Sequence, residues 1–122
     1  MVRFNAVHPV VDVRDVRKSA QWYVDSLGFD LLFIDDGEPN YAGLGRDGVE
    51  IHLQWHSAEE WETMSGSVYR FLLDEPDSFF AECRTRGVEL PPGKSVEDTT
   101  WGTREFGLYD PDGNALFFYR DR

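Results

Sequence analysis

Hydrophobic and polar residues alternate between positions 101 and 119, and this pattern predicts a β-hairpin. The segment Asp-Pro-Asp-Gly at 110–113 has the residues of a type I turn, because proline suits its second position and glycine its fourth. Two strands therefore flank the turn. One face of the hairpin is mixed and aromatic, and the other is apolar, with Phe106, Leu108, Leu116 and Phe118.

The first half of the chain reads as one strand, one helix and three strands. Asp15 is placed as a helix N-cap and Gly28 as the residue that ends the helix, with Val16, Ala20, Tyr23 and Leu27 at helical spacing. The pair Asp47-Gly48 suits a two-residue hairpin turn. The strands are expected at Phe4–Val13, Phe29–Ile34, Tyr41–Leu44 and Val49–Trp55, with Trp55 in the core.

The second half repeats this order. A strand is expected at Val68–Leu73, followed by a helix that begins near Pro76 and ends at Gly87. Gly87 matches Gly28 at an offset of 59 and Gly113 matches Gly48 at an offset of 65, so an insertion of about six residues is expected within 91–100. The sequence predicts an α+β fold in one domain, with two pseudo-repeated βαβββ modules at about 1–57 and 66–122.

Composition narrows the function classes. The 122 residues carry a net charge of −11, with acidic clusters expected in loops, so a nucleic acid is not an expected partner. The charge favours solubility, adaptation to salt, or attraction of a cationic ligand. Cys83 is the single cysteine and is expected to be a buried, inert thiol. Without an apolar leader or membrane-length segment, we expect a soluble cytoplasmic protein without a membrane partner.

Several segments together resemble the glyoxalase, bleomycin-resistance and extradiol-dioxygenase superfamily, also called vicinal oxygen chelate. The resemblance covers essentially the whole chain. It implies a cup formed by curled sheets, helices on the outside, and a homodimer with ligand at the interface. The segments that carry it are His8–Val11, Val13–Asp15, Trp22-Tyr23, Leu27–Phe29, Trp101–Phe106 and Asp110–Asn114.

The resemblance implies that catalytic members hold a divalent metal at four positions, two in each module. His8 and His52 occupy the positions of module one, but the repeat offsets place Phe117 opposite His52 and Ser67 or Val68 opposite His8. Phenylalanine and valine cannot bind a metal. We therefore expect no cofactor, with a divalent metal ion held by His8, His52 and Glu105 as the alternative. Glu50, near one rim of the cup, is not expected to substitute.

Without a metal, the cup becomes a cleft lined with aromatic and acidic groups, which suits a flat cationic molecule. The resemblance is closest to the bleomycin-resistance branch and implies that Trp101 stacks on the drug, beside an aromatic and acidic loop. No residue is predicted to be catalytic. The predicted ligand-binding residues are Trp101, Phe33, Asp35, Asp36, His52, Phe117, Tyr119 and Trp61.

Three classes of function stay open at this point. The first is non-catalytic sequestration of a cationic, aromatic-containing antibiotic of the bleomycin class. The second is a metal-dependent lyase, isomerase or dioxygenase with an atypical ligand set. The third is a structural or regulatory protein that binds no drug. Phe117 favours the first class over the second, because a metal ligand at that position would favour an enzyme.

Overall fold

A computed structural model describes residues 1–38 and 40–122. Among these residues no helix is long and apolar enough to span a membrane. The elements, in chain order, are β1 (Val10–Val13), α1 (Val16–Leu27), β2 (Asp30–Ile34), β3 (Tyr41–Arg46), β4 (Val49–Trp55), α2 (Ala58–Trp61), β5 (Val68–Leu72), α3 (Pro76–Thr85), β6 (Glu97–Asp98), β7 (Thr103–Tyr109) and β8 (Ala115–Asp121).

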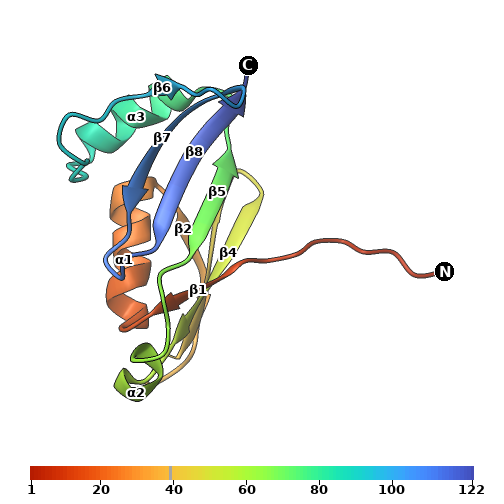
Figure 1. Cartoon of the computed structure of the whole chain (residues 1–122). Helices are drawn as coiled ribbons and strands as arrows, with labels where there is room; N and C mark the ends of the chain where they lie inside the picture. Colours follow the sequence, from red (N-terminus) through yellow and green to blue (C-terminus); the bar gives the residue numbers. More distant parts are fainter. Residues whose placement is uncertain (39) are drawn as a thin grey trace.

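The strands form two four-stranded mixed sheets. The strand orders are β1-β4-β3-β2 and β5-β8-β7-β6. The parallel pairs are β1 with β4 and β5 with β8, which are the first and last strands of each module in chain order. Helix α1 packs on the first sheet and α3 on the second, on the same side of the strands (Figure 1). The predicted α+β fold of two βαβββ repeats with outer helices is confirmed. The module boundaries near 57 and 66 stay a prediction, and α2 lies between them.

Each sheet turns one face toward its helix, and the apolar side chains on that face form the core. Successive residues of a strand point to opposite faces, so buried residues alternate with more exposed ones in β1, β4 and β8. The opposite face of each sheet, which we call the free face, is not covered by these helices. The core residues contributed by the strands include Val11, Val13, Ala42, Leu44, Ile51, Leu53, Phe106, Leu108, Leu116 and Phe118.

Local signals in the first half are confirmed in detail. The Asp15 carboxylate accepts a hydrogen bond from the Lys18 N–H (3.1 Å), and Gly28 ends α1 in the left-handed region at φ 71°. Asp47 and Gly48 both have positive φ, at 49° and 81°, as the two-residue hairpin turn requires. These short-range rules predict the structure well because each depends only on neighbouring residues.

The first strand is shorter than the sequence predicts. It begins at Val10 and not at Phe4, and the residues before it form an exposed arm that leads away from the sheets (Figure 1). Proline has no N–H to donate to the hydrogen bonds of a sheet. The Pro9 carbonyl, at the end of the arm, accepts a hydrogen bond from the His52 N–H (2.9 Å). The alternating pattern of the arm is present, but within the described chain it has no strand to pair with.

Strand β6 lies within the segment assigned to the insertion. Two further expectations are wrong. Trp55, expected in the core, is 43% exposed. Alternation predicts which face of a strand a residue occupies, but not whether the end of that strand is covered. Of the acidic clusters expected in loops, Glu59 and Glu60 lie in α2, and Glu97 and Asp98 form β6.

A buried carboxylate joins the second module to the first. Asp110, in the turn between β7 and β8, accepts a hydrogen bond from the Tyr23 hydroxyl of α1 (2.7 Å). It also accepts from the backbone N–H groups of Asp112 and Asn114 and from the Asn114 side chain, each at 2.9 Å. Burial and the Asp110 charge raise the pKa of Tyr23 well above its usual value, so the phenol keeps its proton. The Asn114 amide also donates to the Asp12 carbonyl (3.0 Å).

Replacing Asp110 by alanine should lower the free energy of unfolding by at least about 3 kcal/mol, because four donors, three of them in buried hydrogen bonds, lose their acceptor. Tyr23→Phe removes one donor and should cost only about 1–2 kcal/mol. Urea denaturation of both variants measures these values. Equal costs for the two variants, or a loss below about 1 kcal/mol for Asp110→Ala, would contradict the assigned role of the carboxylate.

Candidate functional site

The free faces of the two sheets carry equivalent rows of residues. In the first sheet the register aligns Val10, His52 and Gly43. In the second sheet it aligns Arg70, Phe117 and Gly107. Phe117 therefore occupies the position that His52 has in the first module. By the same register, Val68 corresponds to His8, since each lies two residues before the first member of its row.

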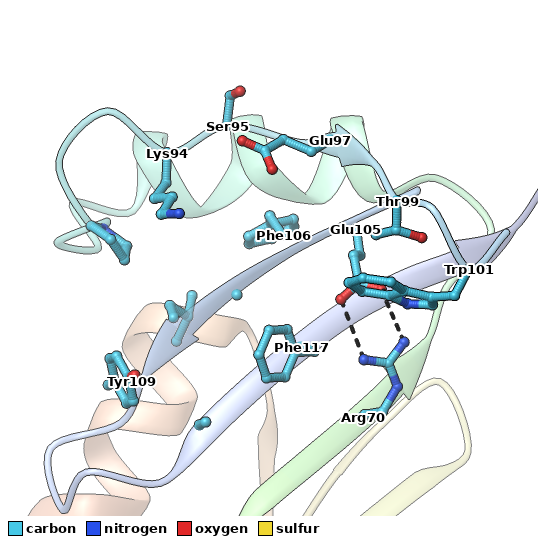
Figure 2. A pocket seen from close by; sticks show the side chains of 14 residues that line it. Arg70, Lys94, Ser95, Glu97, Thr99, Trp101, Glu105, Phe106, Tyr109 and Phe117 are labelled. Carbon is cyan, nitrogen blue, oxygen red and sulfur yellow. Dashed lines mark hydrogen bonds and ion pairs between the residues drawn. The ribbon is translucent and has the colours of Figure 1, made fainter. Parts of the chain in front are cut away.

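A pocket of about 470 Å³ lies on the free face of the second sheet. This volume is in the range of small-molecule sites. The segment 91–99 borders it on one side and β7 and β8 on the other, so residues assigned to an insertion help to form it (Figure 2). We call it the Trp101 pocket. Its lining residues include Arg70, Lys94, Ser95, Glu97, Thr99, Trp101, Glu105, Tyr109 and Phe117.

Trp101 forms one wall of this pocket. Its indole Nε1–H donates a hydrogen bond to Glu105 Oε1 (3.2 Å), and the residue is 67% exposed. Figure 2 shows the indole beside the Arg70–Glu105 pair, with Phe117 on the neighbouring strand. The polar edge of the ring is thus held by the protein, while much of the indole stays accessible.

Glu105 is buried and fully engaged within the second module. Its carboxylate accepts hydrogen bonds from the Arg70 guanidinium (3.1 and 3.3 Å) and from the Thr103 hydroxyl (2.6 Å). The Arg70 guanidinium is the main reason that the pKa of Glu105 lies below its usual value, despite the opposing effect of burial. Glu105 is therefore not placed with His8 and His52, with which the sequence grouped it as an alternative metal ligand.

The sequence predicts a cleft lined with aromatic and acidic groups, but Arg70 and Lys94 also line the Trp101 pocket and give it positive charge. The Arg70 guanidinium lies 4.3 Å from the centre of the Tyr119 ring and 5.7 Å from that of Phe117, which is cation–π geometry. Sequence reasoning missed both cations. The position of Arg70 could have been predicted from the sequence. It alternates in β5 with Tyr69 and Phe71, which are partly buried, and so belongs to the free face.

Glycine makes room for an aromatic ring in each sheet. A Cβ at Gly107 would lie 2.8 Å from Cε1 of Phe117, so the ring rests directly over the strand backbone. A Cβ at Gly43 would overlap the ring of Phe33 in the same way. The position of the Phe117 ring in the Trp101 pocket therefore depends on the absence of a side chain at position 107.

The predicted ligand-binding residues of the first module form a separate group. Phe33 stacks on Tyr41 (ring centres 6.2 Å apart) and meets His52 edge-on (5.4 Å). Asp35 and Asp36 are exposed and follow β2. None of these residues lines the Trp101 pocket.

Trp61 lies apart from both groups, in α2. The Arg14 guanidinium covers its ring at 4.0 Å from the ring centre, and His56 meets it edge-on at 6.3 Å. Its indole Nε1 is buried and has no hydrogen-bond partner among the described residues. Within one chain these contacts explain Trp61 as part of the junction between the modules.

His8, Glu50 and His52 form a cluster in the first module. Glu50 Oε2 lies 2.6 Å from His52 Nε2 and 3.7 Å from His8 Nε2. Glu50, which the sequence did not expect to substitute for the missing ligands, lies beside both histidines, because alternate residues of β4 share one face. The hydrogen bond from His52 is the main cause of the lowered pKa of Glu50. Two imidazoles and a carboxylate fit a divalent metal, whereas Phe117 and Val68 of the second module do not.

Cys83 is the remaining candidate nucleophile, and it is fully buried. Burial raises the pKa of its thiol to about 11, so the reactive thiolate is scarce at neutral pH. The prediction that this thiol is buried is confirmed.

The two matched sheets, with a pocket on a free face, define a fold class that sequence comparison also identifies. A model of the Glyoxalase/Bleomycin resistance protein/Dioxygenase superfamily matches residues 5–118. The chain belongs to this superfamily. It is also 30% identical to proteins named bleomycin resistance protein from Geobacillus stearothermophilus and Staphylococcus aureus, with 92% of this chain and 93% of each relative covered.

Solved structures show the same architecture. A bleomycin-binding protein from Streptomyces verticillus, solved with copper(II)-bleomycin, superposes with a TM-score of 0.76 at 26% identity over the full length of both chains. A bleomycin resistance determinant encoded on transposon Tn5 superposes with a TM-score of 0.81 at 23% identity, covering 98% of this chain and 99% of the other. At 23% identity this second likeness shows the fold alone.

The Glu105–Arg70 pair should make stability depend on pH. Because the folded-state pKa of Glu105 is lowered, its contribution is complete above the unfolded pKa, about 4.3, and is lost as pH falls through the folded value. Wild type should therefore exceed Glu105→Gln in free energy of unfolding at pH 7, and the difference should shrink below about pH 4. Urea denaturation between pH 3 and 7 measures it. Glu59→Gln, at an exposed position of α2, serves as control, and an equal pH dependence for both variants would contradict the assignment.

Proposed function

We propose that this protein binds and sequesters, without modifying it, a cationic antibiotic of the bleomycin class that contains aromatic rings. The observation that carries the proposal is the Trp101 pocket, in which an accessible indole and the ring of Phe117 line the same cavity. A planar heteroaromatic group between such rings gains about 1–3 kcal/mol per stacking contact in nucleobase systems.

The charges of the pocket favour a ligand of mixed polarity. Glu105 is neutralised by Arg70, so Glu97 is the pocket carboxylate best placed to attract a cationic tail. The net charge of −11 adds a long-range field of the same sign. Arg70 and Lys94 can donate hydrogen bonds to carbonyl or ring-nitrogen acceptors. A glycopeptide antibiotic with a cationic tail and many acceptors has this combination of groups.

The relatives support this choice of ligand. Resistance proteins that match nearly the whole chain carry bleomycin in their names, and the Streptomyces verticillus protein was solved with copper(II)-bleomycin. Binding without chemistry is supported by the residues themselves. Phe117 occupies a position where superfamily enzymes need a metal ligand, and Cys83 is buried with a raised pKa. The alternative, a metal-dependent glyoxalase- or dioxygenase-like enzyme, would have to use the His8–Glu50–His52 cluster.

The first test is a titration of chelator-treated protein with metal-free bleomycin, followed by tryptophan fluorescence and calorimetry. We expect saturable quenching at one drug per chain. Trp101→Ala should lower the affinity about 5- to 150-fold, the equivalent of one lost stacking contact of about 1–3 kcal/mol.

Trp55→Ala is the matched control, because Trp55 is also exposed but does not line the pocket. It should leave the affinity unchanged. Absence of saturable binding would refute the sequestration proposal, and an equal loss in both variants would remove Trp101 from the site.

We also infer that the protein acts as a homodimer in the cytoplasm, with no nucleic-acid or membrane partner. The arm before β1 and strand β2 both expose several large apolar side chains. Groups of exposed apolar residues, unlike single scattered ones, mark interaction surfaces. A second copy would cover them and bring a first-module free face close to a Trp101 pocket. That arrangement would bring together the two groups of predicted ligand residues. The exposed apolar side chains of the arm and β2 are Met1, Val2, Phe4, Val7, Leu31, Leu32 and Phe33.

Dimerisation can be tested at the arm. Sedimentation should give twice the 14.1 kDa mass of one chain, and the double substitution Phe4→Ser and Val7→Ser should weaken association, because it removes apolar contacts without touching a strand. Circular dichroism should stay unchanged in the variant. A monomeric wild type would contradict the inference, and unchanged association of the variant would exclude the arm from the interface.

A further inference from the structure

We propose that another cavity, where α1 meets the second module, binds a small organic cation, an ammonium or guanidinium group carried on a short apolar chain. The cavity has a volume of about 460 Å³, in the range of small-molecule sites, and we call it the Trp22 pocket. Helix α1 contributes Trp22 to its lining. The segment after α3 contributes residues 88–92, and the end of β7 with the turn after it contributes residues 109–111.

The cavity lies beside a sheet edge that has no neighbouring strand. Strand β6 has only two residues, and it pairs with Arg104 and Glu105 of β7. No strand in the described ranges pairs with Gly107–Tyr109 on that side of β7. The irregular segment 88–92 borders the cavity there, and it includes two prolines, which have no N–H for a sheet. Side chains, and not a further strand, therefore line this edge.

Contacts outside the cavity hold its walls in place. Tyr23, the neighbour of Trp22, donates the buried hydrogen bond to Asp110 that joins α1 to the turn (2.7 Å). The Trp22 ring meets the Tyr23 ring edge-on, with ring centres 4.9 Å apart. The Val88 N–H donates to the Cys83 carbonyl (3.0 Å), which joins the start of segment 88–92 to α3. The pocket is thus formed by the fold before any ligand enters it.

The lining combines aromatic rings with negative charge. Trp22 is partly buried, whereas Tyr109 is 66% exposed. Asp110 uses its carboxylate for hydrogen bonds within the protein, but Glu89 is exposed and accessible. In the described part of the chain, no lysine or arginine lines this pocket. Because aromatic faces and carboxylates both attract cations, the lining favours an organic cation. The apolar walls that would contact its chain are Val88, Leu90, Pro91, Pro92 and Pro111.

The Trp22 pocket adjoins the Trp101 pocket. Pro91 and Tyr109 line both cavities, and Tyr109 lies at the end of the Trp101 pocket remote from the Trp101 indole (Figure 2). The cation can therefore come from two sources, a free amine or the cationic end of a ligand whose planar part occupies the Trp101 pocket. Only the second source rests on the proposed function, so failure of drug binding does not decide whether the cation site exists.

The first arm of the test uses a free amine. Isotope-labelled full-length protein is titrated with agmatine, which carries a guanidinium and an ammonium group on a short hydrocarbon chain. The indole N–H signal of Trp22, assigned by its loss in Trp22→Phe, is followed by NMR and should shift saturably. The uncharged N-butylacetamide should not shift it. Glu89→Gln and Tyr109→Leu should each lower the affinity for agmatine about 2- to 5-fold, as expected for one exposed charge or cation–π contact.

The second arm identifies the source of the cation. Bleomycin is compared with the same drug hydrolysed at its terminal amide, which replaces the cationic tail by a carboxylate. If the drug supplies the cation, bleomycin should shift the Trp22 signal and displace agmatine, and the hydrolysed drug should do neither. If agmatine binds and bleomycin does not compete with it, the cation is a free amine. Both results support the site.

Glu59→Gln is the matched control, because it removes an exposed carboxylate and changes the net charge equally, but lies outside the Trp22 pocket. Its affinity for agmatine should equal that of wild type, and circular dichroism should show that every variant is folded. Absence of a saturable Trp22 shift with both agmatine and bleomycin would overturn the proposal. So would equal affinities of Glu89→Gln and Glu59→Gln, or an equal Trp22 shift with the hydrolysed drug.

Discussion

The Asp110 carboxylate is the interaction on which the relative placement of the two modules most depends. It organises the turn between β7 and β8 through two backbone N–H groups, and through Tyr23 it fixes that turn to α1. A buried carboxylate is stable only when donors surround it, so the hairpin and the helix constrain each other. The two strands that form the floor of the Trp101 pocket are the strands this turn connects.

The two modules have the same backbone plan but different chemistry on their free faces. Position 52 is a histidine beside a carboxylate, and its equivalent, position 117, is a phenylalanine beside the Arg70–Glu105 ion pair. Because each helix covers only one face of its sheet, these substitutions do not disturb the core. The free face of the first sheet thus carries a cluster of two histidines and a carboxylate, and that of the second sheet carries an aromatic pocket.

The fold was predictable from the sequence because its signals are local. The Asp15 cap, the Asp47-Gly48 turn and the alternation in the last hairpin each depend on residues close in the chain, and all are confirmed. The arm was not predictable, because alternation does not reveal whether a strand has a neighbour to pair with. Phe4 lies in such a segment.

The candidate site was only partly predictable for a related reason. Trp101 and Phe117 followed from the resemblance and from the repeat offset, and both line the pocket. Lys94 lies in a segment without periodicity, so no pattern indicated that it would reach the pocket. The proximity of Glu50 to both histidines depends on the path of the arm, which the sequence did not specify.

We propose that the protein holds its ligand without changing it. The most direct measurement is mass spectrometry of bleomycin after long incubation with an excess of protein, followed by denaturation of the protein and recovery of the drug. We expect the drug bound during incubation to return quantitatively with its mass unchanged. A time-dependent product of altered mass, absent in a buffer control, would contradict binding without chemistry and identify an enzyme.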